Sequence, residues 1–474
     1  MDIRKNRFVN NNVLFFFLII FVSFFLRIYN LNFEDYWLDE QASFWVADPS
    51  LSFTETLARA KELDRGTSLF YNIILKNFFL IIGYEPSVGR YLPFIFGLVS
   101  VPALCYLTFQ IRKNYSFLLV GVLTSINFYL ISYSQEVRVY SFLFLISIIS
   151  IILFFKLLES QNGKWKKYLY SFFYILFSLI GCYSHIFFFI IVVSQFSYLF
   201  LNFLFYKKKQ ILVLLSVFII PLLYLFFMYE YLVLQFNIED HWIVQINLDF
   251  FYNFFFSRFF GSKIMGIIYL SILFYLIYIN RYKILKFDNK NFLFILILFF
   301  SYFLPLVYGI FNQPILTDRY IIFVLIPIFI LISVLILDIK KFKKKYLILF
   351  LILTSSLINS YIEIFKREKS KPDFTSSFEH ILKSDINNIV AKTRSDIIEK
   401  IITNYFKNTK IAKENNLLFF KSSLDHSNLN ALWLLCYKPV NGNDCLLNND
   451  KFSSWSKTDQ IEYKLVISTL YEKY

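Results

Sequence analysis

The stretch VLFFFLIIFVSFFLRIY at residues 13–29, followed by YWLDE at residues 36–40, indicates the fold class. The first run is apolar and long enough to cross the hydrocarbon core of a bilayer. Asp39 and Glu40 place two adjacent carboxylates directly after it. A carboxylate close to hydrocarbon loses much of its hydration, so such residues are usually paired or functional. The stretch therefore predicts a membrane span with a polar site at its exit.

The composition of the whole chain extends this interpretation. The 474 residues are 57% hydrophobic and 22% aromatic, which excludes a water-soluble globular protein and predicts a polytopic membrane protein. The formal net charge is +15, but the basic residues form short clusters between apolar runs, where lipid headgroups are their natural partners. No basic face carries interleaved aromatic residues, so we expect no nucleic-acid partner. No small-residue cleavage site follows the first run, so this span is expected to remain uncleaved.

About eleven apolar runs have the length of a membrane span. We expect spans at Val13–Tyr29, Tyr91–Phe109, Ser116–Ile131, Val139–Leu157, Tyr168–Cys182, Ile186–Leu204, Ile211–Met228, Ile264–Ile279, Phe292–Ile310, Tyr320–Leu337 and Tyr346–Tyr361. The run Leu69–Ile82 is shorter and carries Lys76 and Asn77 at its middle, so a re-entrant or interfacial helix competes with a crossing.

The distribution of charge decides between these two topologies, because cytoplasmic loops collect Lys and Arg. If the N-terminus is cytoplasmic and Leu69–Ile82 does not cross, every basic loop lies in the cytoplasm. These loops are Arg112-Lys113, Lys164 to Lys167, Lys207 to Lys209, Arg281 to Lys283 and Lys340 to Lys345. If it does cross, all of them face outward. We therefore expect one or more non-crossing helices in the first outer loop.

In this topology, polar residues from six separate places emerge on the outer face. They are Asp39-Glu40, Asp64-Arg65, Glu136 and Arg138, His185, Glu239-Asp240-His241, and Asp318-Arg319. Such convergence predicts one site at the outer membrane face.

Five short motifs occur in a fixed order between Arg27 and about Phe374. They are Arg27 to Tyr29 with Trp37 to Glu40, Gly83 to Arg90 leading into residues 92–97, Tyr133 to Tyr140, Ser184-His185, and Pro314 to Tyr320. In this order the chain resembles the GT-C glycosyltransferase superfamily, in the branch of protein O-mannosyltransferases, aminoarabinose transferases of lipid A and related bacterial enzymes.

The resemblance implies an all-α GT-C membrane fold and an inverting sugar transfer from a polyprenyl-phosphate donor, with the catalytic acid in the first outer loop. Sugar transfer needs a carboxylate to accept the proton of the attacking hydroxyl and cations to hold the leaving phosphate. Asp39 is the candidate base. Glu40 would raise the proton affinity of the pair or share a cation with it. The alternative is that both acids cap a helix beginning near Gln41.

Arg138 and Arg319, with Arg65, are candidates for binding the donor phosphate, because a guanidinium donates two parallel hydrogen bonds. The alternative for the first two is snorkelling toward lipid headgroups. Asp64 and Glu136 are expected on the acceptor side. In relatives a Pro-Pro pair often follows the acidic residue, and Gly66-Thr67-Ser68 stands there instead, so Asp64-Arg65 as a solvated surface pair is an open alternative.

Tyr140, His185 and Tyr320 are expected to line the rest of the pocket, with an ordinary interfacial histidine as the alternative for His185. His241, beside Trp242, is a weaker candidate for a gate above the site. We expect no cofactor and no metal, because Arg138 and Arg319 can neutralise one phosphate. A Mg²⁺ or Mn²⁺ ion bound by acidic residues of the site is the alternative.

The composition changes after Tyr361, which predicts a membrane domain over residues 1–361 and a small soluble α/β domain over residues 362–474. Helices are expected at Asp373–Leu382 and Ser395–Phe406, and strands at Asn416–Phe420 and Leu432–Cys436. Cys436 and Cys445 form a disulfide or remain free thiols. Cys105 and Cys182 are expected to pack within spans.

These interpretations place the protein in the cytoplasmic (inner) membrane, with a cytoplasmic N-terminus and a periplasmic C-terminal domain. Its expected partners are membrane lipids, a polyprenyl-phosphate sugar, and a glycan, lipid or protein acceptor. Two other functions fit the hydropathy. A polysaccharide polymerase or ligase would share the outer cations and the lipid-linked donor, whereas a lipid-linked-sugar transporter would place charges within its spans.

Overall fold

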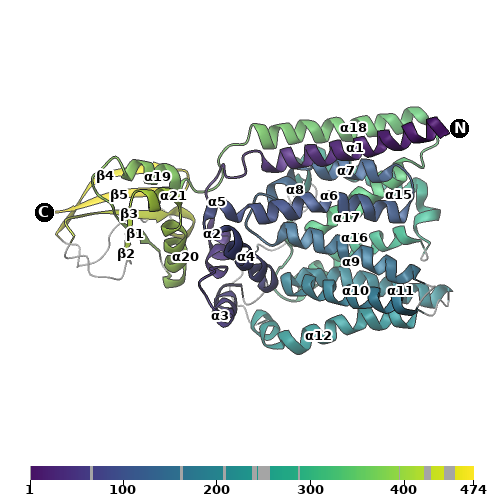
Figure 1. Ribbon diagram of the computed structural model, residues 1–474, viewed down its shortest axis with the longest axis horizontal. Coiled ribbons are helices and arrows are strands. Elements are labelled where there is room, and N and C mark those ends of the chain that lie inside the picture. Colours follow the sequence, from purple (N-terminus) through teal and green to yellow (C-terminus); the bar gives the residue numbers. More distant parts are fainter. Residues whose placement is uncertain are drawn as a thin grey trace.

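The structure is a computed structural model that describes residues 2–64, 68–160, 164–206, 210–236, 243, 257–286, 289–393, 395–420, 429–441 and 454–474. Long helices form one bundle, and a smaller part built around a sheet lies against one end of it (Figure 1). The long helices are α1 (Asp2–Ile28), α6 (Tyr91–Ile111), α7 (Ser116–Ile126), α9 (Tyr140–Glu159), α10 (Lys164–Ser184), α11 (Phe189–Tyr206), α12 (Ile211–Phe236), α15 (Lys263–Ile284), α16 (Lys290–Phe311), α17 (Leu325–Ile336) and α18 (Phe342–Ser360). Shorter helical segments are α8 (Phe128–Tyr133), η1 (Ile186–Phe188), α14 (Ser257–Phe260), η2 (Arg319–Val324) and η3 (Tyr361–Phe365).

Eight helical segments of the described chain are long and apolar enough to cross a membrane. They are Pro86–Ile111, Tyr140–Glu159, Ile186–Tyr206, Ile211–Tyr229, Lys263–Ile284, Lys290–Phe311, Arg319–Ile336 and Phe342–Phe365. The other three expected spans correspond to α1, α7 and α10. The apolar parts of α1 and α7, Asn12–Ile28 and Ser116–Ile126, are shorter than those of the eight, and α10 begins with a lysine-rich turn. These three helices pack among the eight, with α1 against α6 and α7, and α10 against α9 and α12. The expected polytopic helical membrane fold is confirmed.

Four further helices lie where the bundle meets the sheet-containing part (Figure 1). They are α2 (Leu38–Val46), α3 (Phe53–Asp64), α4 (Leu69–Ile82) and α5 (Pro86–Gly89). The 14 residues of α4 give a length of about 21 Å, which is less than the hydrocarbon core. Lys76 donates a 3.0 Å hydrogen bond to Thr56 of α3, so the polar middle of α4 is anchored within this layer. The segment does not have the length of a span.

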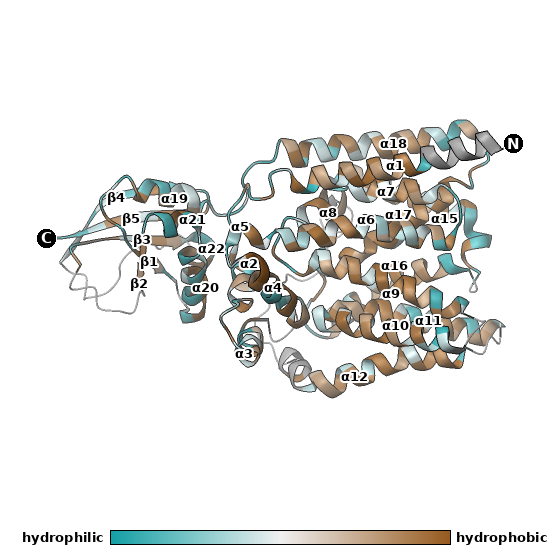
Figure 2. Cartoon of the chain, viewed as in Figure 1, coloured by the Kyte–Doolittle hydropathy of each residue, from teal (hydrophilic) through white to brown (hydrophobic). Residues whose placement is uncertain are grey.

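Charged residues gather at the two ends of the bundle. The end away from the sheet carries the start of α1 and the basic loops that the structure describes, and the hydropathy colours of Figure 2 show polar residues concentrated at both ends. At this end Arg112, after α6, pairs with Asp338, after α17, and Lys290 of α16 pairs with Glu159 of α9. Of the expected basic loops, those at Arg112-Lys113, Lys164 to Lys167, Arg281 to Lys283 and Lys340 to Lys345 therefore lie at one end, and Lys207 to Lys209 lie outside the described residues.

A buried arginine fixes the part of the bundle that carries the turn after α8. Arg27 of α1 donates to the carbonyl oxygens of Thr124 at 3.0 Å and Ser125 at 3.1 Å, which are free because α7 ends there. Gly97 of α6 allows close approach, since a Cβ atom at this position would lie 2.0 Å from the hydroxyl oxygen of Ser134. These contacts hold the turn at residues 134–139 against α1 and α6.

The sheet has five strands in the order β2 (Leu418–Phe420), β1 (Asn388–Lys392), β3 (Ala431–Tyr437), β5 (Val466–Lys473) and β4 (Trp455–Tyr463). The pairs β1–β2 and β1–β3 are parallel, and β3–β5 and β4–β5 are antiparallel. Four helices accompany the sheet: α19 (Phe374–Ile381), α20 (Asp396–Lys407), α21 (Lys410–Glu414) and α22 (Lys438–Asn441). Both expected helices and both expected strands are confirmed. Cys436 is disulfide-bonded, and Cys445, the partner that the sequence offers, lies outside the described residues.

Candidate active site

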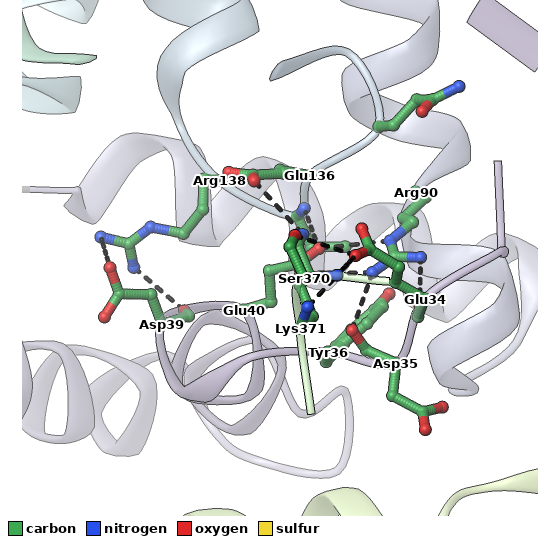
Figure 3. Close-up of polar contacts among 12 residues, drawn as sticks. Glu34, Asp35, Tyr36, Asp39, Glu40, Arg90, Glu136, Arg138, Ser370 and Lys371 are labelled. Atoms are coloured by element: carbon green, nitrogen blue, oxygen red, sulfur yellow. Dashed lines mark hydrogen bonds and ion pairs between the residues drawn. The ribbon is translucent and has the colours of Figure 1, made fainter. Parts of the chain in front are cut away.

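The two acids after the first span belong to the first turn of α2. The helix begins at Leu38, and its N-cap residue Trp37 makes no side-chain capping bond. The helix start near Gln41 that the alternative assumed is therefore wrong, and neither acid is the N-cap residue, but both lie in the first turn of α2, where a carboxylate interacts favourably with the helix dipole. Successive residues on a helix are rotated by about 100°, so Asp39 and Glu40 point to different surroundings (Figure 3).

Asp39 faces a partly open space between two arginines. Its side chain is 34% exposed, and its Oδ2 atom lies 3.0 Å from Arg319 Nη1 and 3.8 Å from Arg138 Nη2. Arg138 reaches it from the turn at residues 134–139, and Arg319 from the start of η2, so three distant segments meet here. The structure thus brings together the candidate base and two candidate phosphate ligands.

Glu40 is completely buried in a different network. Its Oε1 and Oε2 atoms each lie 3.2 Å from Arg90, which is also buried. Lys371 donates to Oε2 at 2.7 Å, and the backbone amide of Val137 donates to Oε1 at 3.0 Å. Among the described residues Glu40 therefore shares no cation with Asp39, because Arg90 and Lys371 bind it from the other side (Figure 3). The Asp39 carboxylate is thus partly exposed, whereas the buried Glu40 carboxylate connects α2 to Arg90, Val137 and Lys371.

Backbone contacts lock α2 to the turn that carries Arg138. Arg138 Nη1 donates to the carbonyl oxygen of Asp39 at 3.0 Å and to the hydroxyl of Ser43 at 3.3 Å. The bond from Val137 to Glu40 adds a second connection one residue away. The position of Asp39 relative to Arg138 is consequently determined by contacts that do not involve the Asp39 side chain.

The pKa values of two buried carboxyl groups reflect these ion pairs. Burial alone raises the pKa of Glu40, but the charges and hydrogen bonds of Arg90 and Lys371 outweigh this effect and lower it. Burial also raises the pKa of Glu34, whereas Arg367 and the backbone amides of Ser370 and Lys371 lower it, with a net decrease. Both groups are carboxylates in the folded protein near neutral pH.

The lowered pKa values predict a loss of stability in acid. Between the folded and unfolded pKa values the unfolded chain binds more protons at Glu34 and Glu40, so the free energy of unfolding falls as the pH falls. The decrease should begin below about pH 5, near the unfolded pKa of glutamate. Thermal unfolding of the purified protein in detergent from pH 7 to pH 3 measures it. A midpoint that stays constant over this range would contradict the assignment.

Glu136 lies on the same turn and is only partly satisfied. Its Oε1 atom is 3.2 Å from Lys371 Nζ, whereas its Oε2 atom is buried and has no hydrogen-bond partner among the described residues. Lys371 therefore stands between Glu40 and Glu136 and links two of the acids that the sequence placed in the site.

Aromatic rings surround Arg319. Its guanidinium carbon lies 5.5 Å from the Trp37 ring, 5.9 Å from the Tyr140 ring and 5.7 Å from the Tyr320 ring. His185 is buried with its ring centroid 4.8 Å from that of Tyr320, and its Nδ1 atom accepts from the amide of Phe187. The candidate residues Tyr140, His185 and Tyr320 are thus one cluster.

The histidine of this cluster is held in its neutral form. Burial, with the positive charges of Arg138 and Arg319, lowers the pKa of His185 to about 3. A neutral imidazole beside two guanidinium groups adds no competing charge to the space at Asp39.

Several candidates are not placed by the structure. Arg65 lies outside the described residues, as do Glu239, Asp240, His241 and Trp242. Asp64 ends α3, and nothing is described of its side chain. Among the described residues there is no group of three or more His, Cys, Asp or Glu side chains arranged to hold a metal ion.

Four charged residues of this region were not among the sequence candidates: Glu34, Arg90, Arg367 and Lys371. Arg90 ended one of the quoted motifs, and the basic run beginning at Lys366 marked a change of composition. Complementary charge was the sequence signal that could have identified them. The acidic first outer loop and the basic segment after the last span are expected on the same face of the membrane, where they can form ion pairs.

Comparison by sequence finds no matching family model and no matching curated protein. The fold is similar to that of ArnT from Cupriavidus metallidurans in the apo state, with a TM-score of 0.61 and 8% identity over 98% of both chains. ArnT bound to undecaprenyl phosphate gives a TM-score of 0.60 with 9% identity, covering 97% of this chain and 98% of that one. The apo oligosaccharyltransferase of Archaeoglobus fulgidus gives 0.53 with 10% identity, covering 88% of this chain and 66% of that one.

These similarities define the class of the fold. The chain is a multipass membrane protein with the GT-C fold, and the resemblance found in the sequence is confirmed at the level of the fold. At 8% to 10% identity these comparisons show the fold alone, so the chemistry has to be argued from the residues of the site.

Proposed function

We propose that the protein is an inverting glycosyltransferase that moves a sugar from a polyprenyl-phosphate donor to an acceptor hydroxyl at the outer face of the cytoplasmic membrane. The observation that carries the proposal is the partly exposed Asp39 carboxylate between Arg138 and Arg319. A carboxylate and two guanidinium groups in one space are the groups that such a transfer needs.

The proposed chemistry follows from their roles. The acceptor oxygen attacks the anomeric carbon as the bond from that carbon to the phosphate oxygen breaks, and Asp39 takes the proton of the attacking hydroxyl. The electron pair of the broken bond leaves with the polyprenyl phosphate. Arg138 and Arg319 stabilise this negative charge by charge-assisted hydrogen bonds.

The contacts of Asp39 bear on how the donor would bind. Asp39 supplies a negative charge to two neighbouring guanidinium groups. The donor phosphodiester brings a second anion that competes for the same groups, so the Asp39 side chain is released toward the acceptor. In this proposal two arginines neutralise one phosphate, and no metal ion takes part.

Two further observations support the donor class and the side of action. The basic loops that the structure describes lie at the end of the bundle away from α2, the helix of Asp39, and the positive-inside rule assigns that end to the cytoplasm. The site then faces outward, where nucleotide sugars are absent and a lipid-linked sugar is the available donor. ArnT, which shares this fold, has been crystallised with undecaprenyl phosphate.

Replacing Arg138 by alanine should weaken donor binding by about 1–3 kcal/mol, because one charge-assisted hydrogen bond to the phosphate is lost. Binding of undecaprenyl phosphate to the purified protein, measured by microscale thermophoresis, gives the value. Arg112→Ala, at the opposite end of the bundle, is the matched control and should bind normally. Equal affinities of Arg138→Ala and the wild type would exclude Arg138 from the phosphate site.

The proposed function is tested with purified protein and a panel of radiolabelled polyprenyl-phosphate sugars, with and without EDTA. The expected product is free polyprenyl phosphate, together with transfer of label to an envelope glycan, lipid or protein acceptor. Polyprenyl pyrophosphate as the lipid product would favour a polymerase or ligase. No product from any donor would overturn the proposal and favour transport.

A further inference from the structure

The linker between the last span and the sheet, residues 366–373, lies against the first outer loop. Arg367 pairs with Glu34 and donates to Gln135 at 3.1 Å. Ser370 donates its hydroxyl to Glu34 at 2.9 Å, and the amide of Lys371 donates to the same carboxylate at 3.1 Å. Several bonds over five residues fix the path of the linker beside α2 (Figure 3).

The path of the linker places the side chain of Lys371 between two acidic residues of the site, Glu40 and Glu136. The Lys371 side chain is only 10% exposed and contacts Glu40 at 2.7 Å and Glu136 at 3.2 Å. Glu40 is already paired with Arg90, through two contacts of 3.2 Å. Among the described residues, Lys371 is the one cation that forms an ion pair with Glu136. The position of the Glu136 carboxylate therefore depends on this lysine.

The second oxygen of Glu136 identifies what the pair is suited to bind. Glu136 Oε2 is buried and accepts no hydrogen bond from any described residue. A buried carboxylate oxygen without a donor loses its hydration without compensation, so a bound donor group would stabilise it. The turn that carries Glu136 also carries Arg138, which contacts Asp39. A ligand at Asp39 thus lies beside the turn that offers this acceptor.

We propose that Lys371 is a positioning residue that holds Glu136 so that its free oxygen accepts a hydrogen bond from a hydroxyl group of the transferred sugar. The proposal rests on the proposed function and adds a sugar-recognising pair to it. Arg138 and Arg319 bind the phosphate, and the pair of Glu136 with Lys371 distinguishes a sugar-bearing lipid from the bare lipid phosphate.

This division of roles predicts a split between two affinities. Lys371→Met and Glu136→Gln should each raise the KM for the polyprenyl-phosphate sugar about tenfold, the effect of one hydrogen bond to a charged acceptor. Each should leave the affinity for undecaprenyl phosphate, which carries no sugar, within about twofold of the wild type. Because the two residues act as one unit, the double variant should be no worse than either single variant.

Matched variants control the experiment. Lys369→Met removes a lysine from the same linker, where it pairs with Asp373 at 3.1 Å, and should change neither affinity. Lys371→Arg keeps the charge and should restore most of the donor affinity. A Lys371→Met protein with a normal KM, or with equal losses for both lipids, would overturn the inference while the wild type remains active. Failure of the proposed function itself is recognised separately, as a wild type that consumes no donor.

Discussion

Replacing Asp39 by asparagine is expected to lower turnover by at least about 100-fold, because the proton of the attacking hydroxyl loses its acceptor. The side chain keeps its size, and α2 is fixed by Glu40 and by the bond from Arg138 to the Asp39 backbone. The fold should therefore be unchanged. Removal of the negative charge also removes an anion that competes with a phosphate for Arg138 and Arg319, so donor binding should be equal or tighter.

Initial rates of polyprenyl phosphate release at saturating donor measure the first effect, and direct binding of undecaprenyl phosphate measures the second. Asp48→Asn is a suitable control, because Asp48 lies beyond the end of the same helix and pairs with Arg59 at 3.7 Å. Near-normal turnover of Asp39→Asn would remove Asp39 as the base. Loss of donor binding along with turnover would assign it to binding instead.

Replacing Glu40 by glutamine should destabilise the protein by about 3–5 kcal/mol, since it leaves buried cations without their counter-charge. Arg90 is buried beside it, and Lys371 would keep only Glu136 as an anionic partner. Docking of the linker should weaken as well. Thermal unfolding in detergent, followed by near-ultraviolet circular dichroism, records the change.

The matched control for Glu40→Gln is Glu55→Gln, an exposed glutamate near the start of α3 that contacts Ser52. Its unfolding midpoint should stay close to that of the wild type. A Glu40→Gln protein as stable as the wild type would show that the buried network is not a determinant of stability. In that case the different burial of the two acids would have no energetic consequence.

Hydropathy and charge sufficed to predict the membrane bundle and the end on which the polar loops meet, whereas the non-crossing of Leu69–Ile82 stays a prediction. These features are local, or follow from counting crossings, so they can be read from sequence. The meeting of Arg138 and Arg319 at Asp39 was predicted only as sharing a face. Contacts across 99 and 280 residues fix it, and the sequence gives no distance for them.

The division between Asp39 and Glu40 was not predictable from the sequence. The two residues were expected to influence each other or share a cation, and the helix start three residues earlier turns them apart. The cations that bind Glu40 come from the end of α5 and from the linker, 50 and 331 residues away. A lysine in a polar segment after the last span carries no local sign that it will be buried beside an acid of the first loop.

In the sheet, too, the sequence predicts only those strands that have a clear apolar pattern of their own. Strands β2 and β3 were recognised from short apolar runs, whereas β4 is largely exposed and alternates little. Its pairing with β5 depends on the partner strand and not on its own sequence pattern.

The most direct test of the central claim compares the two neighbouring acids in one experiment. Asp39→Asn and Glu40→Gln are purified in parallel, and release of polyprenyl phosphate is measured per folded molecule together with the unfolding midpoint. We predict that Asp39→Asn keeps the wild-type midpoint and loses turnover, whereas Glu40→Gln loses stability and keeps measurable turnover in its folded fraction. The opposite pattern, with a stable and inactive Glu40→Gln and an active Asp39→Asn, would contradict the assignment of the base.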